Sequence, residues 1–312
     1  MNGLQTIDSA SIERRAEINA ELFNRFLTYL DAAPKTTETY TRALKQFFSY
    51  LVCNGISQPK RADILSYRDE LSNTGHKPTT VQNYIAAVKV FFSWTAQEGL
   101  YPNVAERIKT PKIDREYKKD YLAAAQVKGI METIERDSLQ GLRDYAVFAL
   151  MVSCGLRDIE VSRADIQDLR TVGGDAAIYI QGKGRAERAE YVKVPGQVEK
   201  AIRAYLAARG EANEGEPLFA SLSNNSKKKR LTTRSISRII KTRLKGAGYN
   251  SDRLTAHSLR HTAVTLSLLA GKDITEVQQY ARHANIATTM IYNHSLDKAK
   301  NGCSEAVANL IF

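Results

Sequence analysis

Hydrophobic residues recur at helical spacing through the first third of the chain, between about residues 12 and 109. Apolar side chains three and four positions apart indicate amphipathic helices, and prolines fall between the apolar segments as helix starts or stops. The pattern predicts four helices in this region, with room for a short fifth.

The two clearest helices are predicted over Thr36–Cys53 and Thr79–Gln97. Their apolar stripes are Tyr40, Leu44, Phe47 and Leu51 in the first helix and Val81, Ile85, Val88 and Phe92 in the second. Because each stripe has to be buried, we expect the two stripes to face each other. Thr79 and Gln82 have the spacing of a capping box just after Pro78, which predicts a well-defined helix start.

The segment from Lys109 to Tyr121, KTPKIDREYKKDY, is polar and charged, contains Pro111 and has almost no apolar periodicity. Such a composition is typical of a linker between two domains. The predicted division is an N-terminal leader (1–11), a helical domain (12–109), a linker (110–121) and a second domain (122–312).

The second domain is predicted to be mostly helical with a small β-sheet. Ala176–Ile180 and Glu190–Val194 flank the turn-rich run QGKGRAER and predict a β-hairpin, and a third strand is expected near Asp168–Val172. The helical segments are Ala123–Glu135, Leu139–Cys154, Val198–Arg209, Thr232–Gly246, Ser258–Gly271, Asp273–Ala281 and a last one near Leu296–Ile311. The predicted fold class is therefore mainly α with a small β-sheet, in two domains.

Length and charge narrow the function. A chain of 312 residues with 43% hydrophobic residues has room for two packed cores, and its formal net charge of +11 indicates a polyanionic partner. Residues 1–115 carry 15 basic and 12 acidic side chains, whereas residues 116–312 carry 30 and 22, so most of the excess lies in the second domain. The basic run SKKKR at 226–230, taken alone, is better explained as a solvated loop than as a site.

Cysteine usage and the N-terminal sequence exclude several classes of protein. Cys53, Cys154 and Cys303 lie far apart, which argues against a disulfide scaffold and against a thiolate zinc site. The first residues lack the basic start and apolar run of a signal peptide, and no stretch approaches the roughly 18 apolar residues of a membrane span. We expect a soluble, cytoplasmic protein in a reducing compartment, with no membrane partner.

Four segments of the second domain hold residues able to bind a phosphate: CGLRDIE (154–160), QGKG (181–184), HSLRHT (257–262) and RHANIATTMIYNH (282–294). Each segment is weak evidence alone, because by default Arg157 is a surface charge, Lys183 is a hairpin tip and Tyr292 is a half-buried aromatic. His257 and Arg260 are stronger candidates. Their three-residue spacing places both on one face at a helix N-terminus, where unpaired N–H groups and the helix dipole favour anions. A polar helix start with a capping role explains the same pair equally well.

Six residues, taken in order, resemble the active-site set of the tyrosine recombinases, the phage-integrase family of site-specific DNA recombinases. They are Arg157, Lys183, His257, Arg260, His283 and Tyr292. Neighbouring positions agree with the family pattern as well, namely Gly155, Leu156, Glu160, Gly182, Gly184, Leu259, His261, Thr288, Thr289 and His294.

The resemblance covers about residues 12–312 and implies a helical, SAM-like core-binding domain followed by a tyrosine-recombinase catalytic domain. In the first domain the resemblance depends on the number and position of the helices rather than on a motif. The layout is similar to that of the two-domain, Xer-like members, since only about 15 residues precede the first predicted helix and leave no room for a separate arm-binding domain.

Two positions depart from the family pattern. Arg282 stands where the family usually has glycine before the histidine, and Cys154 stands where Thr or Ser is common. Arg282 places a bulky cation beside His283, so we expect a different local turn and a different phosphate contact there. Neither departure removes a catalytic group.

The resemblance implies that Tyr292 attacks the scissile phosphate and forms a 3′-phosphotyrosyl bond, which conserves the phosphodiester energy without ATP. Arg157 and Arg260 would stabilise the negative charge of the transition state, and His283 would donate a further hydrogen bond. His257 would assist proton transfer near Tyr292.

Other residues complete the implied site. Lys183 would protonate the leaving 5′-oxygen, Glu160 would orient Arg157 or pack its helix, and His261 and His294 are interpreted as supporting residues. Histidines interspersed with arginines suit a phosphate rather than a metal ion, so neither a metal nor another cofactor is expected.

The resemblance also implies the partners. These are duplex DNA recombination sites, bound through Lys and Arg on the phosphates, and a homo-tetramer that synapses two sites and passes through a Holliday junction. A C-terminal helix would dock on the neighbouring subunit, with Ala306, Val307, Leu310 and Ile311 as its apolar edge. An accessory directionality factor is a further possible partner, and the protein would be nucleoid-associated when bound to DNA.

Two other functions stay open at this point. A sequence-tolerant nicking and closing enzyme of the topoisomerase IB type uses the same chemistry without synapsis. A catalytically silent DNA-binding protein with the same fold is favoured only by Arg282. The cognate site and the direction of the reaction, whether integration, excision, inversion or dimer resolution, are not specified by the sequence.

Overall fold

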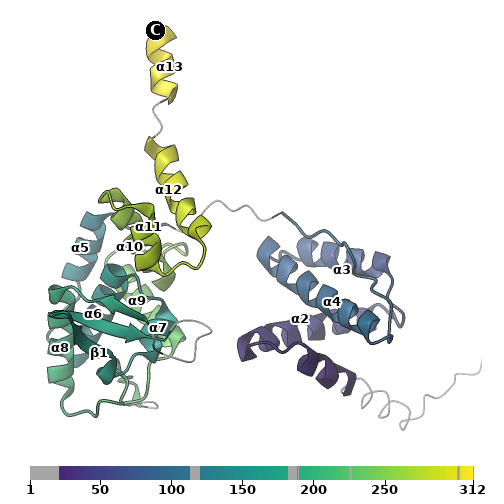
Figure 1. The fold of residues 1–312 in the computed structure, drawn as a ribbon, viewed down its shortest axis with the longest axis horizontal. Coiled ribbons are helices and arrows are strands. Elements are labelled where there is room, and N and C mark those ends of the chain that lie inside the picture. The colour runs from purple at the N-terminus through teal and green to yellow at the C-terminus, as the bar shows by residue number, and fades with distance from the viewer. Residues whose placement is uncertain are drawn as a thin grey trace, which may run out of the picture. The chain divides into compact units, whose positions relative to one another are not determined.

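The computed structural model describes residues 21–112, 120–181, 188, 190–224, 227–300 and 303–311, with 294–300 and 303–305 described by their backbone only. These residues form two compact units, one within 1–115 and one within 116–312 (Figure 1). The predicted leader 1–11 and most of the predicted linker lie outside the described residues.

The first unit is helical, as predicted. Its described elements are a helix over 21–29, α2 (Pro34–Cys53), α3 (Arg61–Asn73) and α4 (Pro78–Gln97). The helices predicted over 36–53 and 79–97 are confirmed within two residues. Both begin with a proline, whose fixed φ and missing N–H suit the first position of a helix.

The predicted capping box at the start of α4 is wrong. The residue that precedes the helix is Lys77, and its side chain makes no capping hydrogen bond. Pro78 already has helical geometry, so Thr79 lies one residue inside the helix and cannot serve as its cap. The position of the helix start follows from the proline alone.

The two predicted apolar stripes do face each other, because α2 packs against α4. Leu44 and Phe47 of α2 and Val88 and Phe92 of α4 belong to one buried cluster, in which Tyr40 is only partly buried. The rings of Phe47 and Phe92 meet edge to face with their centroids 6.0 Å apart.

The second unit contains three antiparallel strands and nine helices among its described residues. The strands are β1 (Leu169–Val172), β2 (Asp175–Ile180) and β3 (Glu190–Lys193), in the order β1-β2-β3. The helices are α5 (Ala124–Glu132), α6 (Leu139–Cys154), α7 (Asp158–Arg163), α8 (Gly196–Arg209), α9 (Thr233–Gly246), α10 (Ala256–Leu269), α11 (Ile274–Ala281), α12 (Ile286–Lys300) and α13 (Cys303–Ile311). Ile178 of β2 lies opposite Leu169 of β1 and Val192 of β3.

Helix α6 forms the centre of this unit and packs against α8, α9 and α10. Its residues from Ala146 to Val152 are buried on every side, which explains their continuous apolar sequence. The helix ends at Gly155, which is left-handed with φ 58°. A Cβ atom at this position would also lie 3.3 Å from the ring of Tyr280, so the turn that precedes Arg157 requires glycine.

The end of the chain differs from the prediction. A single helix was expected near Leu296–Ile311, but α12 begins ten residues earlier at Ile286 and ends at Lys300, and α13 follows from Cys303. The apolar residues of α12 are spread around the helix instead of lining one face, which is why its periodicity gave no clear signal. No helix among the described residues has both the length and the apolar character needed to span a bilayer.

Candidate functional site

Arg157 lies between α6 and α7, at the position just before α7 begins. Its backbone N–H donates to Oε2 of Glu160 at 2.8 Å, and its Nη1 donates to Oε1 of the same carboxylate at 2.7 Å. The Arg157 side chain is 29% exposed and that of Glu160 is 1% exposed. One buried carboxylate therefore fixes the positions of both the backbone N–H and the guanidinium of Arg157. Part of the Arg157 side chain remains exposed and accessible to a ligand.

Arg260 belongs to α10 and is buried. Its Nη1 donates to the carbonyl of Gly155 at 2.6 Å, and its Nη2 donates to the carbonyl of Ala281. Burial, and then the charges of Arg157 and Arg282, lower the pKa of Arg260 to about 10. Arg260 thus stays charged at neutral pH and ties together three segments that are far apart in sequence.

His283 follows α11 and is held by its neighbours on both sides. Its Nδ1 lies 2.9 Å from the hydroxyl oxygen of the buried Thr289, and its backbone N–H donates to the carbonyl of Gln278. Burial, and then the charges of Arg260, Arg157 and Arg282, lower the pKa of His283 to about 4. His283 is therefore neutral at pH 7, with a fixed ring orientation.

Tyr292, on α12, is 6% exposed. Its hydroxyl is hydrogen-bonded to Nδ1 of His261, and its ring lies nearly parallel to that of His283 with the centroids 6.2 Å apart. Burial raises the pKa of Tyr292 to about 12, although the charges of Arg260 and Arg157 act in the opposite direction. The phenol is protonated at neutral pH, and the cations that favour its ionised form are already close.

His261, interpreted from the sequence as a supporting residue, contacts the Tyr292 hydroxyl directly. His261 is 3% exposed, its ring meets that of His257 edge-on at 4.3 Å, and burial followed by the charge of His283 lowers its pKa to about 3. A signal was present, because positions four apart on a helix are neighbours and His257 and His261 have that spacing on α10.

His257 and Arg260, predicted to share one face at the start of a helix, differ in burial. His257 is exposed in the first turn of α10, whereas Arg260 is buried and points to backbone carbonyls. The three-residue spacing brings both residues to the same end of the helix, but tertiary packing gives their side chains different surroundings.

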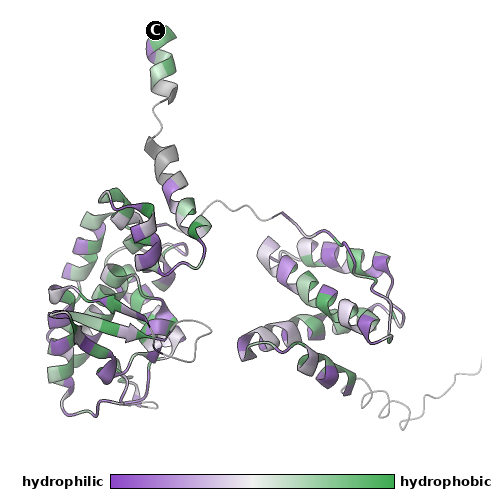
Figure 2. Cartoon of the chain, in the orientation of Figure 1, coloured by the Kyte–Doolittle hydropathy of each residue, from purple (hydrophilic) through white to green (hydrophobic). Residues whose placement is uncertain are grey.

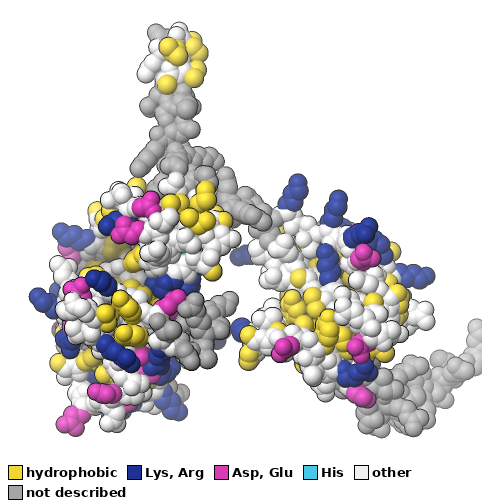
Figure 3. All heavy atoms as spheres, viewed as in Figure 1, with side chains coloured by type: hydrophobic (Ala, Val, Ile, Leu, Met, Phe, Trp, Pro, Cys, Tyr) yellow, Lys and Arg dark blue, Asp and Glu magenta, His cyan; other side chains and the backbone are white. Residues whose placement is uncertain are grey.

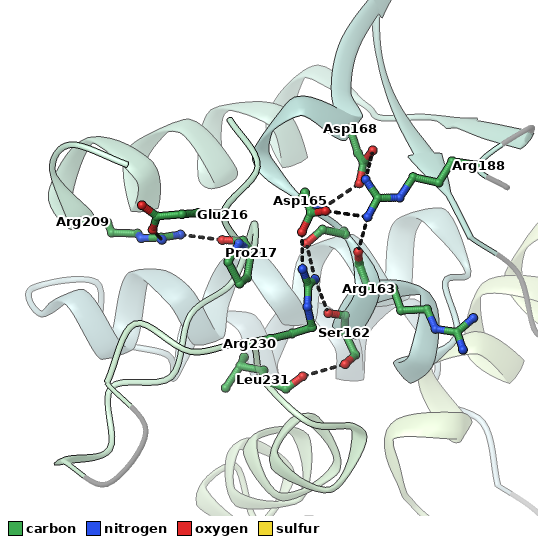
Figure 4. Close-up of polar contacts among 11 residues, drawn as sticks. Ser162, Arg163, Asp165, Asp168, Arg188, Arg209, Glu216, Pro217, Arg230 and Leu231 are labelled. Atoms are coloured by element: carbon green, nitrogen blue, oxygen red, sulfur yellow. Dashed lines mark hydrogen bonds and ion pairs between the residues drawn. The ribbon is translucent and has the colours of Figure 1, made fainter. Parts of the chain in front are cut away.

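Lys183 and the tip of its hairpin lie outside the described residues, as does the side chain of His294. The described residue Arg188, just before β3, donates to Asp165 at 2.5 Å and to Asp168 at 2.8 Å (Figure 4). Asp165 also accepts from Arg230, whose Nη1 donates to the carbonyl of Ser162 in α7 at 2.9 Å. These buried carboxylates hold the end of α7, the helix that Arg157 begins.

Taken together, the arrangement suits an anionic substrate. Arg157, Arg260 and Arg282 place three cations around the ring cluster of His261, His283 and Tyr292. Fixed cations in a partly water-excluded site stabilise charge that develops on phosphate oxygens. Within the part of the chain that the structure describes, no group of three or more His, Cys, Asp or Glu could hold a metal ion.

Comparison with known proteins supports the same conclusion. The model of the phage integrase family matches residues 120–299, and that of the phage integrase N-terminal SAM-like domain matches residues 22–99. Tyrosine recombinase XerC of Herpetosiphon aurantiacus is 32% identical over 88% of this chain and 91% of its own length. Tyrosine recombinase XerA of Pyrococcus furiosus is 29% identical over 89% and 91%.

Solved structures show the same fold. XerH site-specific recombinase bound to its palindromic difH substrate has a TM-score of 0.71 at 20% identity, over 96% of this chain and 90% of that chain. A lambda integrase dimer bound to a COC′ core site has a TM-score of 0.67 at 16% identity, over 86% and 96%. The predicted fold class, with a SAM-like helical domain and a catalytic domain of helices with a small sheet, is confirmed. The chain therefore belongs to the phage integrase family and is an enzyme of the tyrosine recombinase type.

Proposed function

We propose that this chain is a site-specific DNA recombinase that cleaves and rejoins duplex DNA through a 3′-phosphotyrosyl intermediate at Tyr292. The observation that carries the proposal is the position of the Tyr292 hydroxyl, which is bound to His261 and lies close enough to Arg157 and Arg260 for their charges to offset part of the rise in pKa that burial causes. A protein that only binds DNA has no need for a phenol in such surroundings.

In the proposed cleavage step, the Tyr292 oxygen attacks the scissile phosphorus in line and the bond to the 5′-oxygen breaks. Arg157, Arg260 and neutral His283 stabilise the charge on the non-bridging oxygens. His261 orients the phenol through its hydrogen bond, and His257, whose ring meets that of His261 edge-on, assists the transfer of the phenol proton away from the attacking oxygen.

Lys183 is proposed to protonate the departing 5′-oxygen. A 5′-hydroxyl from the partner duplex then attacks the phosphotyrosyl bond and releases Tyr292. Two such exchanges pass through a Holliday junction. The bond energy is conserved in the covalent intermediate, so the reaction is proposed to need no ATP, metal or other cofactor.

The proposed DNA-binding surface of the catalytic domain (122–312) includes the loop before α9 and the first turns of α9. The exposed cations there that form no ion pair with a described residue are Lys227, Lys228, Lys229, Arg234 and Arg238. Together with the proposed core-binding domain (12–109) and the linker (110–121), they would neutralise backbone phosphates, so affinity should fall steeply with salt. The basic run at 226–230, which the sequence alone suggested was a solvated loop, thus gains a proposed role from its position.

Helix α13 is proposed to dock on a neighbouring subunit of a synaptic tetramer. The helix carries both hydrophobic and hydrophilic positions (Figure 2), and its hydrophobic side chains are exposed (Figure 3). Val307, Leu310 and Ile311 are 53%, 88% and 67% exposed. Apolar exposure of this degree on an amphipathic helix is typical of an interface. An accessory directionality factor would act on this assembly.

The experiment that tests the proposal compares the wild type with Tyr292→Phe on a supercoiled plasmid library of candidate sites from around the gene, without added metal. Denaturing gels should show a covalent complex that maps to one sequence and is absent for the variant. A complex that persists in Tyr292→Phe, or no complex while DNA binding persists, would contradict the proposal. Relaxation of every plasmid regardless of sequence would instead support the topoisomerase-like function.

A further inference from the structure

Arg282 has an unusual backbone conformation. It ends α11 with φ 53° and ψ 47°, the left-handed region that glycine adopts easily and that a bulky side chain adopts at a cost. Strain of this kind persists only where the surroundings hold the residue in place. The contacts of the Arg282 side chain should therefore reveal what the conformation serves.

The side chain of Arg282 points into the protein and is 10% exposed. Its Nη2 donates to Oε2 of Glu160 at 2.8 Å and to the carbonyl of Gly155 at 3.2 Å, and its Nη1 donates to the carbonyl of Tyr280 at 2.8 Å. Both terminal nitrogens are thus occupied by acceptors of the protein itself. Unlike Arg260, which donates only to backbone carbonyls, Arg282 is paired directly with a buried carboxylate.

Two of these acceptors are shared with the arginines of the proposed phosphate site. Glu160 holds Arg282 through Oε2 and the Arg157 guanidinium through Oε1, and the carbonyl of Gly155 accepts from both Arg282 and Arg260. In addition, Nη2 of Arg157 donates to the backbone carbonyl of Arg282 at 3.3 Å. Arg282 is therefore linked to each phosphate-site arginine through at least one shared acceptor.

We propose that Arg282 is a positioning residue, which holds Arg157 and Arg260 in the phosphate-binding arrangement by fixing Glu160 and the carbonyl of Gly155. The inference rests on the proposed function of this site. In this chain the Arg282 guanidinium lies against the two acceptors that it shares with Arg157 and Arg260. Glycine at the same position would leave Glu160 bound to Arg157 alone. The effect of Arg282 is thus on the rate of strand cleavage rather than on DNA affinity.

The test measures single-turnover cleavage of a nicked suicide substrate at saturating protein. Arg282→Gly and Arg282→Asn both fit the left-handed backbone and remove the guanidinium, while Arg282→Lys keeps the charge without the fork. Arg203→Gln, which removes an exposed guanidinium on α8, is the matched charge control. Cleavage by the Gly and Asn variants should slow by about 10- to 100-fold, because small misplacements of catalytic groups have effects of this size. The Lys variant should lie between them and the wild type, and Arg203→Gln should cleave normally.

A double variant separates positioning from a general structural role. If Arg282 acts through Glu160, then Arg282→Gly combined with Glu160→Gln should cleave no more slowly than Glu160→Gln alone. DNA Kd, measured by anisotropy, should stay within about threefold of the wild type for the Arg282 variants. A wild-type cleavage rate in Arg282→Gly, fully multiplicative effects in the double variant, or slowing explained by weaker DNA binding would overturn the inference. Absence of a Tyr292-dependent complex in the wild type itself would overturn the proposed function, and this inference with it.

Discussion

Replacing Glu160 by glutamine should destabilise the second unit by about 3 kcal/mol, the lower end of the cost of removing one partner from a buried ion pair. The carboxylate is 1% exposed and neutralises Arg282, which is 10% exposed, together with Arg157, which is 29% exposed. The amide oxygen of glutamine can still accept one of the three donors, and Arg157 is partly screened by solvent, so the full penalty is not expected.

For a unit spanning residues 116–312, a loss of about 3 kcal/mol corresponds to a fall in Tm of roughly 6–12 °C. Calorimetry of the full chain measures this directly. Trp94, the one tryptophan of the chain, lies in the first unit. The unfolding midpoint that its fluorescence reports should therefore be the same in the wild type and in Glu160→Gln. Glu276→Gln is the matched control, because it removes a carboxylate from a surface ion pair in which both side chains are 57% exposed. This change should lower the free energy of unfolding by less than about 1 kcal/mol.

The pH dependence follows from the lowered pKa of Glu160. Burial alone raises this pKa, but the charge of Arg282 and then the hydrogen bonds and charge of Arg157 outweigh it. A carboxylate whose pKa is lower in the folded than in the unfolded state stabilises the protein above the unfolded pKa, about 4.3. That contribution is lost as the pH falls through the folded pKa. The Tm difference between wild type and Glu160→Gln should therefore be full at pH 7 and shrink below about pH 4.

Two results would refute this reasoning. Equal Tm values for Glu160→Gln and Glu276→Gln at pH 7 would show that the buried carboxylate does not stabilise the fold. A Tm difference that stays constant or grows below pH 4 would show that ionisation of Glu160 is not its source.

Three further predictions concern the reaction. His261→Phe preserves ring packing but removes the hydrogen-bond partner of the Tyr292 hydroxyl, so single-turnover cleavage should fall by about 100-fold or more with DNA binding retained, and a wild-type rate would show that this hydrogen bond does not position the phenol. Truncation after Lys298 removes α13 and should leave a DNA-binding monomer with poor recombination, measured by sedimentation and plasmid resolution; unchanged recombination would contradict the docking role. Covalent complex formation should persist in excess EDTA, and its abolition by the chelator would count against a site made only of arginine, histidine, lysine and tyrosine.

The fold was largely predictable because it depends on local periodicity. The apolar stripes of α2 and α4 follow from helix geometry, and the hairpin of β2 and β3 follows from the turn-rich run between them, so both depend on near neighbours in sequence. Elements without such a pattern were missed or misplaced. Helix α7 has only six residues, and the apolar residues of α12 do not line one face, so neither produced a clear periodic signal. The cap at Thr79 failed because the proline before it already begins the helix.

The residue types of the candidate site were also readable in the sequence, since Arg157, Arg260, His283 and Tyr292 stand in the family's order. Their contacts were not. Arg157 meets Arg282 across 125 positions, and Arg260 meets Gly155 across 105. Such contacts depend on how α6, α10 and α11 pack, and the short-range pattern of a sequence does not encode that packing. Tertiary structure alone decided that Arg282 supports the arginine pair through Glu160 and that His261 binds the phenol.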